Sequence, residues 1–359
     1  MHVKRDYSVL GPENAAAVAK GLANAQWYRC AVPRKQMKEL MQRSDGPAIR
    51  DTILWVLLFI AFAAGAAYFW GTWACVPFFI GYGVLYGSST DSRWHECGHG
   101  TAFKSFWLNN LVYQVACFMI MREPEIWRWS HTRHHTDTII VGRDPEIVAM
   151  RPPAIWKIAF YFIGWPTAYI ALKKLVIHST GRLLPDEQTW VPESEWPKVV
   201  RTARISLVIH VAAVVAAIAL RSWLPVMLVG PLPFMYGTWL SVIFGLTQHV
   251  GLAEDVLDHR LCSRTVYMNP VFRFIYWNMN YHVEHHMFPM VPYHALPKLH
   301  EAIKHDTPAP CRSTIEAYFG EIIPALLKQQ RDPAYTVRRP LPSSATPYGG
   351  TPGAAVPAE

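Results

Sequence analysis

Two pairs of long uncharged segments constrain the fold of this chain more than any other feature. The first pair covers residues 53–70 and 73–90, and the second covers residues 205–220 and 223–246. Only two residues separate the members of each pair, Gly71 and Thr72 in the first and Arg221 and Ser222 in the second. A transmembrane helix needs about 20 mainly apolar residues, so each pair predicts a membrane hairpin with a tight turn. We therefore expect an all-α integral membrane protein with four transmembrane helices.

Nine of the sixteen histidines form four short groups beside these apolar segments. His95 and His99 are four residues apart, which places both imidazoles on one face of a helix. Two triplets have the spacing i, i+3, i+4, which gathers three imidazoles on one helical face. The triplets are His131, His134 and His135, then His282, His285 and His286, and the single His249 lies between them. Isolated surface or core histidines do not cluster in this way, so the nine residues predict a metal site.

The number of histidines favours two metal ions. A zinc ion uses four ligand positions, so nine imidazoles are about twice what one zinc takes, whereas two ions with four or five ligands each fit the count. Neutral imidazole suits iron, zinc or copper. Iron is favoured because a site beside lipid, without a Ser-His pair or a phosphate-binding loop, has little hydrolytic equipment. Two ferrous ions can together activate dioxygen against an unactivated methylene.

A shared metal site requires all four histidine groups on one side of the membrane. An even number of crossings must then separate them, so the apolar segments 105–121 and 155–172 are expected to be interfacial or re-entrant. The first fifty residues hold nine lysines and arginines, whereas the proposed outer turns hold only Arg221. By the positive-inside rule, the histidines and both termini are expected to face the cytoplasm. The net charge of +8 then reflects topology and anionic lipid, and we expect no nucleic-acid partner.

Three motifs resemble the histidine boxes of the membrane fatty acid desaturase superfamily. They are HECGHGT at His95, HTRHH at His131 and NYHVEHHMFP from Asn280 to Pro289. With the hairpins, the resemblance extends from about residue 53 to residue 292. It implies four transmembrane helices under a cytosolic helical cap that holds two irons (Fe2+/Fe3+) over a substrate tunnel. The implied ligands are the nine histidines, with His249 matching an isolated histidine that many members place after the last membrane helix.

One position departs from the acyl-CoA branch of that superfamily. There, an asparagine four residues before the isolated histidine reaches a metal through water, and here Gly245 occupies that place. Asn280 or Gln248 is the candidate to substitute for it, or one iron has an open position.

Metal-bound histidines usually donate their second ring N–H to a carboxylate or a carbonyl. The candidates in or beside the boxes are Asp144, Glu96, Asp137 and Glu284, with Asn280 as a further polar neighbour. Asp144 ranks first because the stretch from Arg143 to Glu146 resembles an Asp-Pro-Glu element common after the second box. Trp127 and Trp129 fit either a substrate channel or an anchor at the membrane interface.

The predicted function is O2-dependent desaturation of an acyl chain by a non-haem diiron oxidoreductase, with no catalytic residue beyond the metal ligands. The alternatives on the same site are a hydroxylase, an epoxidase or a decarboxylase that acts on an acyl chain or a smaller amphiphile. A His-rich metal transporter or sensor is the alternative from another class, but His210 is the only ionisable residue inside the predicted spans. The chain has no haem-binding HPGG element, ferredoxin cysteine pattern or GxGxxG loop. A separate ferredoxin or cytochrome donor, fed by NAD(P)H, is therefore expected to dock near the arginines around the second box.

The domain organisation expected from these features has four parts. Residues 1–50 form a cytosolic N-terminal region, 51–310 the membrane domain with the histidine boxes, and 311–337 a C-terminal cytosolic helix. The stretch 338–359 is rich in Pro, Ala, Gly and Ser and is expected to be disordered and dispensable. The six cysteines form no CxxC pair and are expected to be reduced structural thiols. Seven histidines are expected to be ordinary surface or core residues: His2, His178, His210, His259, His294, His300 and His305.

Overall fold

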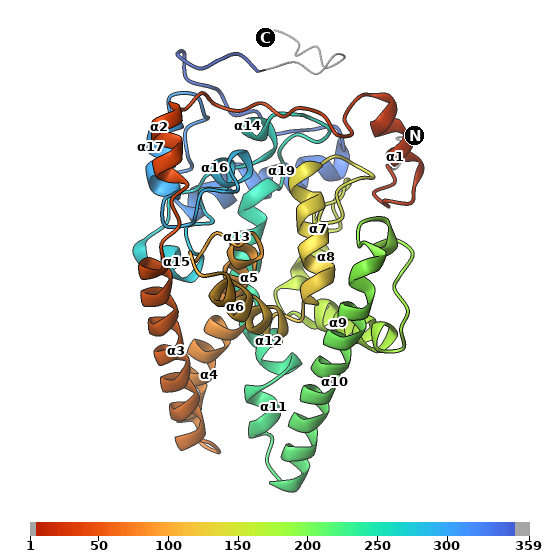
Figure 1. Cartoon of the computed structure of the whole chain (residues 1–359), viewed down its shortest axis with the longest axis vertical. Coiled ribbons are helices and arrows are strands. Elements are labelled where there is room, and N and C mark those ends of the chain that lie inside the picture. The colour runs from red at the N-terminus through yellow and green to blue at the C-terminus, as the bar shows by residue number, and fades with distance from the viewer. Residues whose placement is uncertain (1–4, 349–359) are drawn as a thin grey trace.

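A computed structural model describes residues 5–348, and within them the fold is entirely helical apart from two isolated β-bridges. Figure 1 shows that two hairpins project toward one end of the molecule, while the N-terminal helices and the last described residues lie at the other. The N-terminal part contains α1 (Pro12–Ala19), α2 (Arg34–Leu40), α3 (Asp45–Tyr68), η1 (Trp73–Cys75), α4 (Val76–Gly83), η2 (Val84–Ser88), α5 (Ser89–Gly98) and α6 (Phe106–Met119). The central part contains α7 (Pro124–Thr136), α8 (Ile155–Tyr161), α9 (Trp165–Ser179), η3 (Glu187–Thr189), η4 (Glu193–Glu195), α10 (Trp196–Ala219), α11 (Leu224–Leu228), α12 (Pro231–Gly237) and α13 (Trp239–His249). The C-terminal part contains α14 (His259–Cys262), α15 (Pro270–Ile275), α16 (His282–Met287), α17 (Leu296–Ile303), α18 (Thr314–Glu316), η5 (Ala317–Ile322) and α19 (Ile323–Arg331).

The first hairpin consists of α3 and the broken helix that returns from it. Gly71 makes the turn with a φ of +86°, a conformation that glycine adopts without steric cost. The returning helix changes to a π-helical turn at η2 before α5 begins. Trp55 of α3 donates its indole N–H to the carbonyl of Leu85, at 3.1 Å, and so binds the irregular turn to α3. The π-turn thus sets the direction of α5, which carries the first histidine group.

The second hairpin consists of α10 and the shorter helices α11 to α13. The chain breaks at Gly230, whose φ is +99°, and α12 then returns beside α4 and η2. The contact is between backbones, because a Cβ at Gly237 would lie 2.0 Å from the carbonyl oxygen of Gly83. Glycine at this point therefore lets the two hairpins approach each other closely.

Two helical stretches, Arg34–Tyr68 and Glu193–Ala219, are long and apolar enough to cross a membrane. The α8–α9 pair would make a third only if its 75° bend is one broken span. The predicted returning spans are interrupted at η2 and at Gly230, so length and composition alone support two or three crossings rather than four. Exposed apolar side chains along α3 and α10, such as Leu57, Ile60, Val208 and Ile218, fit contact with lipid.

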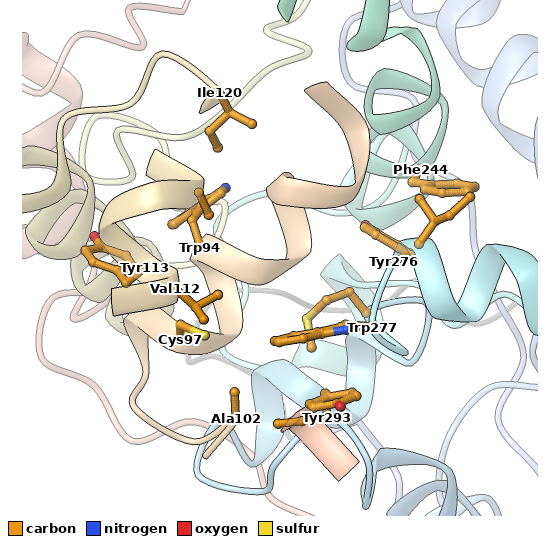
Figure 2. Packing of buried hydrophobic residues seen from close by; sticks show 14 of the residues in the cluster. Trp94, Cys97, Ala102, Val112, Tyr113, Ile120, Phe244, Tyr276, Trp277 and Tyr293 are labelled. Carbon is orange, nitrogen blue, oxygen red and sulfur yellow. The ribbon is translucent and has the colours of Figure 1, made fainter. Parts of the chain in front are cut away.

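The main hydrophobic core lies around α5 (Figure 2). Trp94, Cys97 and Tyr113 pack on one side of that helix, while Tyr276 and Trp277 approach from the other. Cys97, which lies between two histidines of the first box, is buried in this packing and 2% exposed. This packing fixes α5 against the C-terminal helices. All six cysteines are free thiols, as expected.

Candidate metal centre

Four helices bring the predicted ligands together. His95 lies on α5 and His99 directly follows it, α7 carries the first triplet, His249 ends α13, and α16 carries the second triplet. These helices meet between the projecting hairpins and the opposite end of the molecule (Figure 1). All nine histidines converge there in two groups, and within each group the candidate ligand atoms lie within 4.8 Å of one another. The first group is His95, His99, His131, His135 and His285, and the second is His134, His249, His282 and His286.

Each triplet divides between the two groups. His131 and His135, four residues apart, lie in the first group, while His134 lies in the second. On α16 the division is reversed, since His282 and His286 lie in the second group and His285 in the first. Successive residues on an α-helix are 100° apart, so the i and i+4 side chains point nearly the same way and the i+3 side chain points to their flank. One helix therefore contributes to both groups.

The distances between ring nitrogens fit metal coordination. Two imidazole nitrogens that bind one ion at about 2.1 Å, at an angle of about 90°, lie roughly 3 Å apart. In the first group the Nε2 atom of His285 lies 2.8 Å from that of His95 and 3.2 Å from that of His135. In the second group the Nε2 atom of His282 lies 2.9 Å from that of His249 and 3.0 Å from that of His286. Each group could hold one metal ion.

Hydrogen bonds at the opposite ring nitrogens leave Nε2 free to bind a metal. The Nδ1–H of His134 donates to Asp144 Oδ2 at 2.8 Å, and that of His249 donates to the carbonyl of Cys262 at 2.7 Å. The Nδ1–H of His131 donates to Glu146 Oε2 at 3.1 Å. A proton on Nδ1 leaves the Nε2 lone pair available, so these partners select the metal-binding tautomer.

Burial keeps most of the imidazoles in the neutral form that metals require. Removal from solvent and repulsion from neighbouring imidazoles lower the pKa of His99 to about 4 and that of His249 to about 3. The pKa values of His95 and His285 are lowered for the same reasons. His134 differs, because burial lowers its pKa but the attraction of the Asp144 carboxylate outweighs this and raises it.

Of the candidate residues around the ligands, Asp144 contacts a predicted ligand directly. Its Oδ2 also accepts the backbone N–H of Ile139 at 2.8 Å, which holds the carboxylate in place. Glu146 makes a similar contact with His131 and accepts the hydroxyl of Ser130 at 2.8 Å. Sequence reasoning did not select Glu146, although it belongs to the same Asp-Pro-Glu element.

The other four candidates bind other groups. Glu96 accepts the hydroxyl of Thr101 at 2.6 Å, and Asp137 pairs with Arg143 at 3.0 Å. Glu284 accepts the hydroxyl of Thr265 at 2.6 Å and the Nδ1–H of His300 at 2.5 Å. Asn280 donates to the carbonyl of Val266 at 2.8 Å. These residues support the backbone around the boxes.

Three histidines expected to be ordinary are buried among ionisable or aromatic partners. His300 joins Glu284 to the hydroxyl of Tyr267, which lies 2.9 Å from its Nε2. The ring of His259 stacks on Trp27, with centroids 4.2 Å apart, behind the second histidine group. His178 lies between two carboxylates. Their sequence surroundings give no signal of these contacts, and His2 lies outside the described residues.

A cavity of about 560 Å³ opens beside both histidine groups. Its lining includes His95 and His131 from the first group and His134, His249 and His282 from the second. Trp127 lines it, whereas Trp129 is not part of the lining and packs against the hydrophobic cluster around Val199, which Trp127 also contacts. Gly245, the position that departs from the acyl-CoA branch, also lines the cavity. So does Gln248, one of the two candidates to substitute there, and it donates to the hydroxyl of Tyr276 at 2.5 Å. An apolar chain in this space would lie against the imidazoles.

The fold and site define a class of protein in which long apolar helices support two buried groups of histidines beside a cavity. Within that class, this chain belongs to the fatty acid desaturase family, whose model matches residues 71–317. The resemblance of the three histidine boxes is thereby confirmed at the level of the family.

Named relatives are distant. Over 299 residues the chain is 25% identical to the acyl-lipid omega-3 desaturase (cytochrome b5), endoplasmic reticulum, of Arabidopsis thaliana, covering 77% of this chain and 75% of that one. It is 24% identical over 226 residues to the sn-1 acyl-lipid omega-3 desaturase (ferredoxin) of Nostoc sp. (strain 36), covering 58% and 62%. It is 24% identical over 212 residues to the sn-1 oleoyl-lipid 12-desaturase of Anabaena variabilis, covering 58% and 50%. The match thus spans less than two thirds of the Nostoc and Anabaena proteins, and the membership implies an oxidoreductase without fixing its reaction.

Proposed function

We propose that this chain is a membrane-bound, non-haem diiron oxidoreductase that uses dioxygen to desaturate an acyl chain. The observation that carries the proposal is the convergence of nine histidines into groups of five and four, each with ring nitrogens at coordination distance. When bound there, two ferrous ions would supply the reducing power to activate dioxygen against a methylene group. The names of the relatives, all desaturases of acyl lipids or fatty acids, support the same reaction.

The chain's own residues would position the metals and the acyl chain. Asp144 and Glu146 hold the orientation of His134 and His131, so the ligand set is organised before a metal binds. Apolar side chains of the cavity, such as Ile126, Phe234 and Leu246, would hold the alkyl chain and exclude water. The geometry of that chain relative to the centre would decide whether a second hydrogen is lost or an oxygen is transferred.

The proposed topology has four crossings, two in each hairpin, with the histidine centre and both termini on the cytoplasmic side. The two long apolar helices fit a membrane protein, and the projection of both hairpins toward one end supports the four-crossing arrangement. The domain boundaries at residues 50, 310 and 337 belong to the same proposal. A separate donor protein would deliver electrons from NAD(P)H, and the relatives named with ferredoxin and with cytochrome b5 support this partner class.

Metal analysis of the purified protein tests the centre. We expect close to two irons per chain, and loss of iron and activity when His135 or His286 is replaced by alanine. The exposed His305 provides the matched control, and H305A should retain both irons. One zinc per chain with little iron would contradict the proposal.

Labelled dioxygen tests the reaction. We expect turnover to require dioxygen, a reduced nicotinamide and a donor protein, and the product to lack two hydrogens and carry no labelled oxygen. A product with one labelled oxygen would assign a hydroxylase or an epoxidase to the same centre. Turnover without dioxygen would contradict the oxidative mechanism.

A further inference from the structure

A second buried polar cluster lies on the cavity wall, apart from the nine histidines. His178 is completely buried, and its Nδ1 lies 2.6 Å from Glu123 Oε1 while its Nε2 lies 2.7 Å from Glu187 Oε2. Only an imidazolium can donate from both ring nitrogens, so this geometry defines a charged His178. Lys174 adds a second positive charge, with Nζ 2.8 Å from Glu187 Oε1. Two positive charges thus offset two carboxylates.

One polar atom of this cluster and one of the neighbouring Trp190 are buried and have no hydrogen-bond partner among residues 5–348. They are Oε2 of Glu123, which accepts nothing, and Nε1 of Trp190, which donates to nothing. Trp190 lies at the end of the turn that begins at Glu187. The backbone N–H of Trp190 donates to the carbonyl of Glu187 at 3.2 Å. Burial of a polar atom without a hydrogen-bond partner is unfavourable, and native proteins rarely keep such atoms without a reason. Glu123 and Trp190 both line the cavity, together with Lys174 and Asp186.

The other charged pairs of the cavity wall have their partners. Arg122 pairs with Asp91 at 3.3 Å. Arg151 donates to the carbonyl of Tyr335 at 3.3 Å and to that of Leu252, and it pairs with Glu254 at 3.2 Å. Glu254 also accepts the hydroxyl of Tyr7 at 2.8 Å. Within the described chain, Arg151 and Glu254 satisfy each other and their neighbours. Among these charged groups of residues 5–348, Glu123 is therefore the one that has a buried oxygen free to bind a ligand.

The unpartnered atoms define the chemistry of that ligand. Glu123 offers an acceptor and Trp190 offers a donor, so a group that both donates and accepts would satisfy the two together. The paired charges of the cluster balance, and Asp91 offsets the neighbouring Arg122. Asp186 then adds a negative charge, which disfavours a carboxylate or a phosphate. An ammonium group has no acceptor for the indole N–H. An uncharged hydroxyl or amide meets these conditions.

We propose that Glu123 and Trp190 form the subsite for the polar head of the substrate, and that this head is an uncharged hydroxyl or amide. The inference rests on the proposed function for the view that the cavity holds the substrate. Glu123 directly precedes α7, and His131 lies eight residues further along, which is about 12 Å at 1.5 Å per residue. Ile126 and Trp127 line the cavity along this stretch, so an alkyl chain held at its head would pass over them toward the histidines.

Binding of head-group analogues to the full-length protein in nanodiscs tests the proposal. The radiolabelled probes share one sixteen-carbon chain and differ in the head: 1-hexadecanol, hexadecanamide, palmitate, hexadecylamine and hexadecane. We expect the alcohol and the amide to bind more tightly than the other three. Tighter or equal binding of palmitate or hexadecylamine would overturn the assignment, and selectivity for only one of the two neutral heads would narrow it to that head.

Trp190→Phe isolates the indole N–H with little change in shape. We expect it to weaken binding of the preferred neutral head by about 3- to 10-fold, the effect of one hydrogen bond, and to leave hexadecane binding unchanged. Trp196→Phe is the matched control, because the Nε1–H of Trp196 already donates to the carbonyl of Val191 at 3.2 Å. An equal loss for hexadecane and the neutral probes would show a packing role for Trp190 and contradict the subsite.

These measurements do not depend on turnover. A protein that lacks iron but selects neutral heads would contradict the diiron proposal and support the subsite. A protein that holds two irons but prefers charged heads would do the reverse.

Discussion

Asp144 receives three hydrogen bonds at once, from His134, from the backbone of Ile139 and from the backbone of Glu146. We predict that Asp144→Asn lowers iron affinity by roughly 10- to 100-fold, because the amide no longer offers a charged acceptor to the His134 N–H. Iron content after dialysis against a graded chelator would measure this. Glu301→Gln, at an exposed residue whose ion pair within residues 5–348 is with Lys304, should match the unchanged protein. Equal iron retention by both variants would show that Asp144 does not hold the ligand.

The predicted role of His300 has to be revised, because its side chain makes a buried contact. Its isolated position in the sequence predicts an ordinary surface or core residue. Its ring is buried and donates to Glu284, so His300→Ala would leave that carboxylate oxygen without a partner. We predict a loss of about 1–3 kcal/mol in the free energy of unfolding, whereas the exposed His305→Ala should change it by less than about 0.5 kcal/mol. Denaturant unfolding in detergent would measure both, and equal stabilities would show that the contact between His300 and Glu284 contributes nothing to stability.

Sequence reasoning identified the nine converging histidines because their spacing is local and follows helical periodicity. It ranked Asp144 first, because the stretch after the second box resembles an Asp-Pro-Glu element. It did not select Glu146 of the same element, although both residues accept hydrogen bonds from histidines. It could not identify His178, since its partners lie 55 and 9 residues away and are brought together only by the fold. Contacts between residues that are distant in the sequence therefore could not be predicted from local spacing.

At the scale of elements, the two triplets show what periodicity does and does not determine. The spacing i, i+3, i+4 correctly predicted helices α7 and α16, and one face for each set of imidazoles. It did not predict that the i+3 histidine of each set joins the opposite group. That division depends on how α7 and α16 pack against each other. The spacing of histidines within one helix carries no information about this packing.

The C-terminal segment also differs from expectation. A helical region at 311–337 was expected, and α18, η5 and α19 occupy Thr314–Arg331. The following stretch was expected to be disordered, yet Arg339 is buried and pairs with Glu321 at 3.0 Å. The backbone N–H of Thr346 also donates to Asp306 at 2.8 Å. Polar composition alone does not reveal such contacts, and residues 349–359 lie outside the described range.

Two truncated proteins test which part of this C-terminal segment contributes to stability. We predict that ending the chain after Arg338 lowers the melting temperature by several degrees, because Glu321 and Asp306 lose partners. Ending it after Tyr348 removes only residues outside the described range and should leave melting and turnover unchanged. Thermal melting of the two truncated proteins in the same detergent would compare them. Equal melting temperatures would show that the contacts of Arg339 and Thr346 contribute nothing to stability.

At the scale of the whole molecule, the interrupted helices explain why composition supports two or three crossings while the hairpin pattern predicts four. A span that contains a π-turn or a glycine break is still long enough in total, but no single regular helix covers it. Buried polar side chains and close backbone contacts satisfy the irregular turns, as Ser88 does by donating to the carbonyl of Gly237 at 2.5 Å. The irregular helices are thus compatible with a membrane because the two hairpins pack together.

Cysteine labelling from outside the cell tests this arrangement. In an active protein without its native cysteines, we predict that single cysteines at Gly71 and Ser222 react with an impermeant reagent, because both lie in the tight turns of the projecting hairpins. Cysteines at Ser8, Ser105 and Ser344 should react only after the membrane is permeabilised, since one shared histidine centre requires an even number of crossings between its parts. Ser105 is decisive, because it immediately precedes α6, and α6 separates the first box from the second. External labelling there would mean that α6 crosses the membrane, and His99 and His131 could not then share the first histidine group.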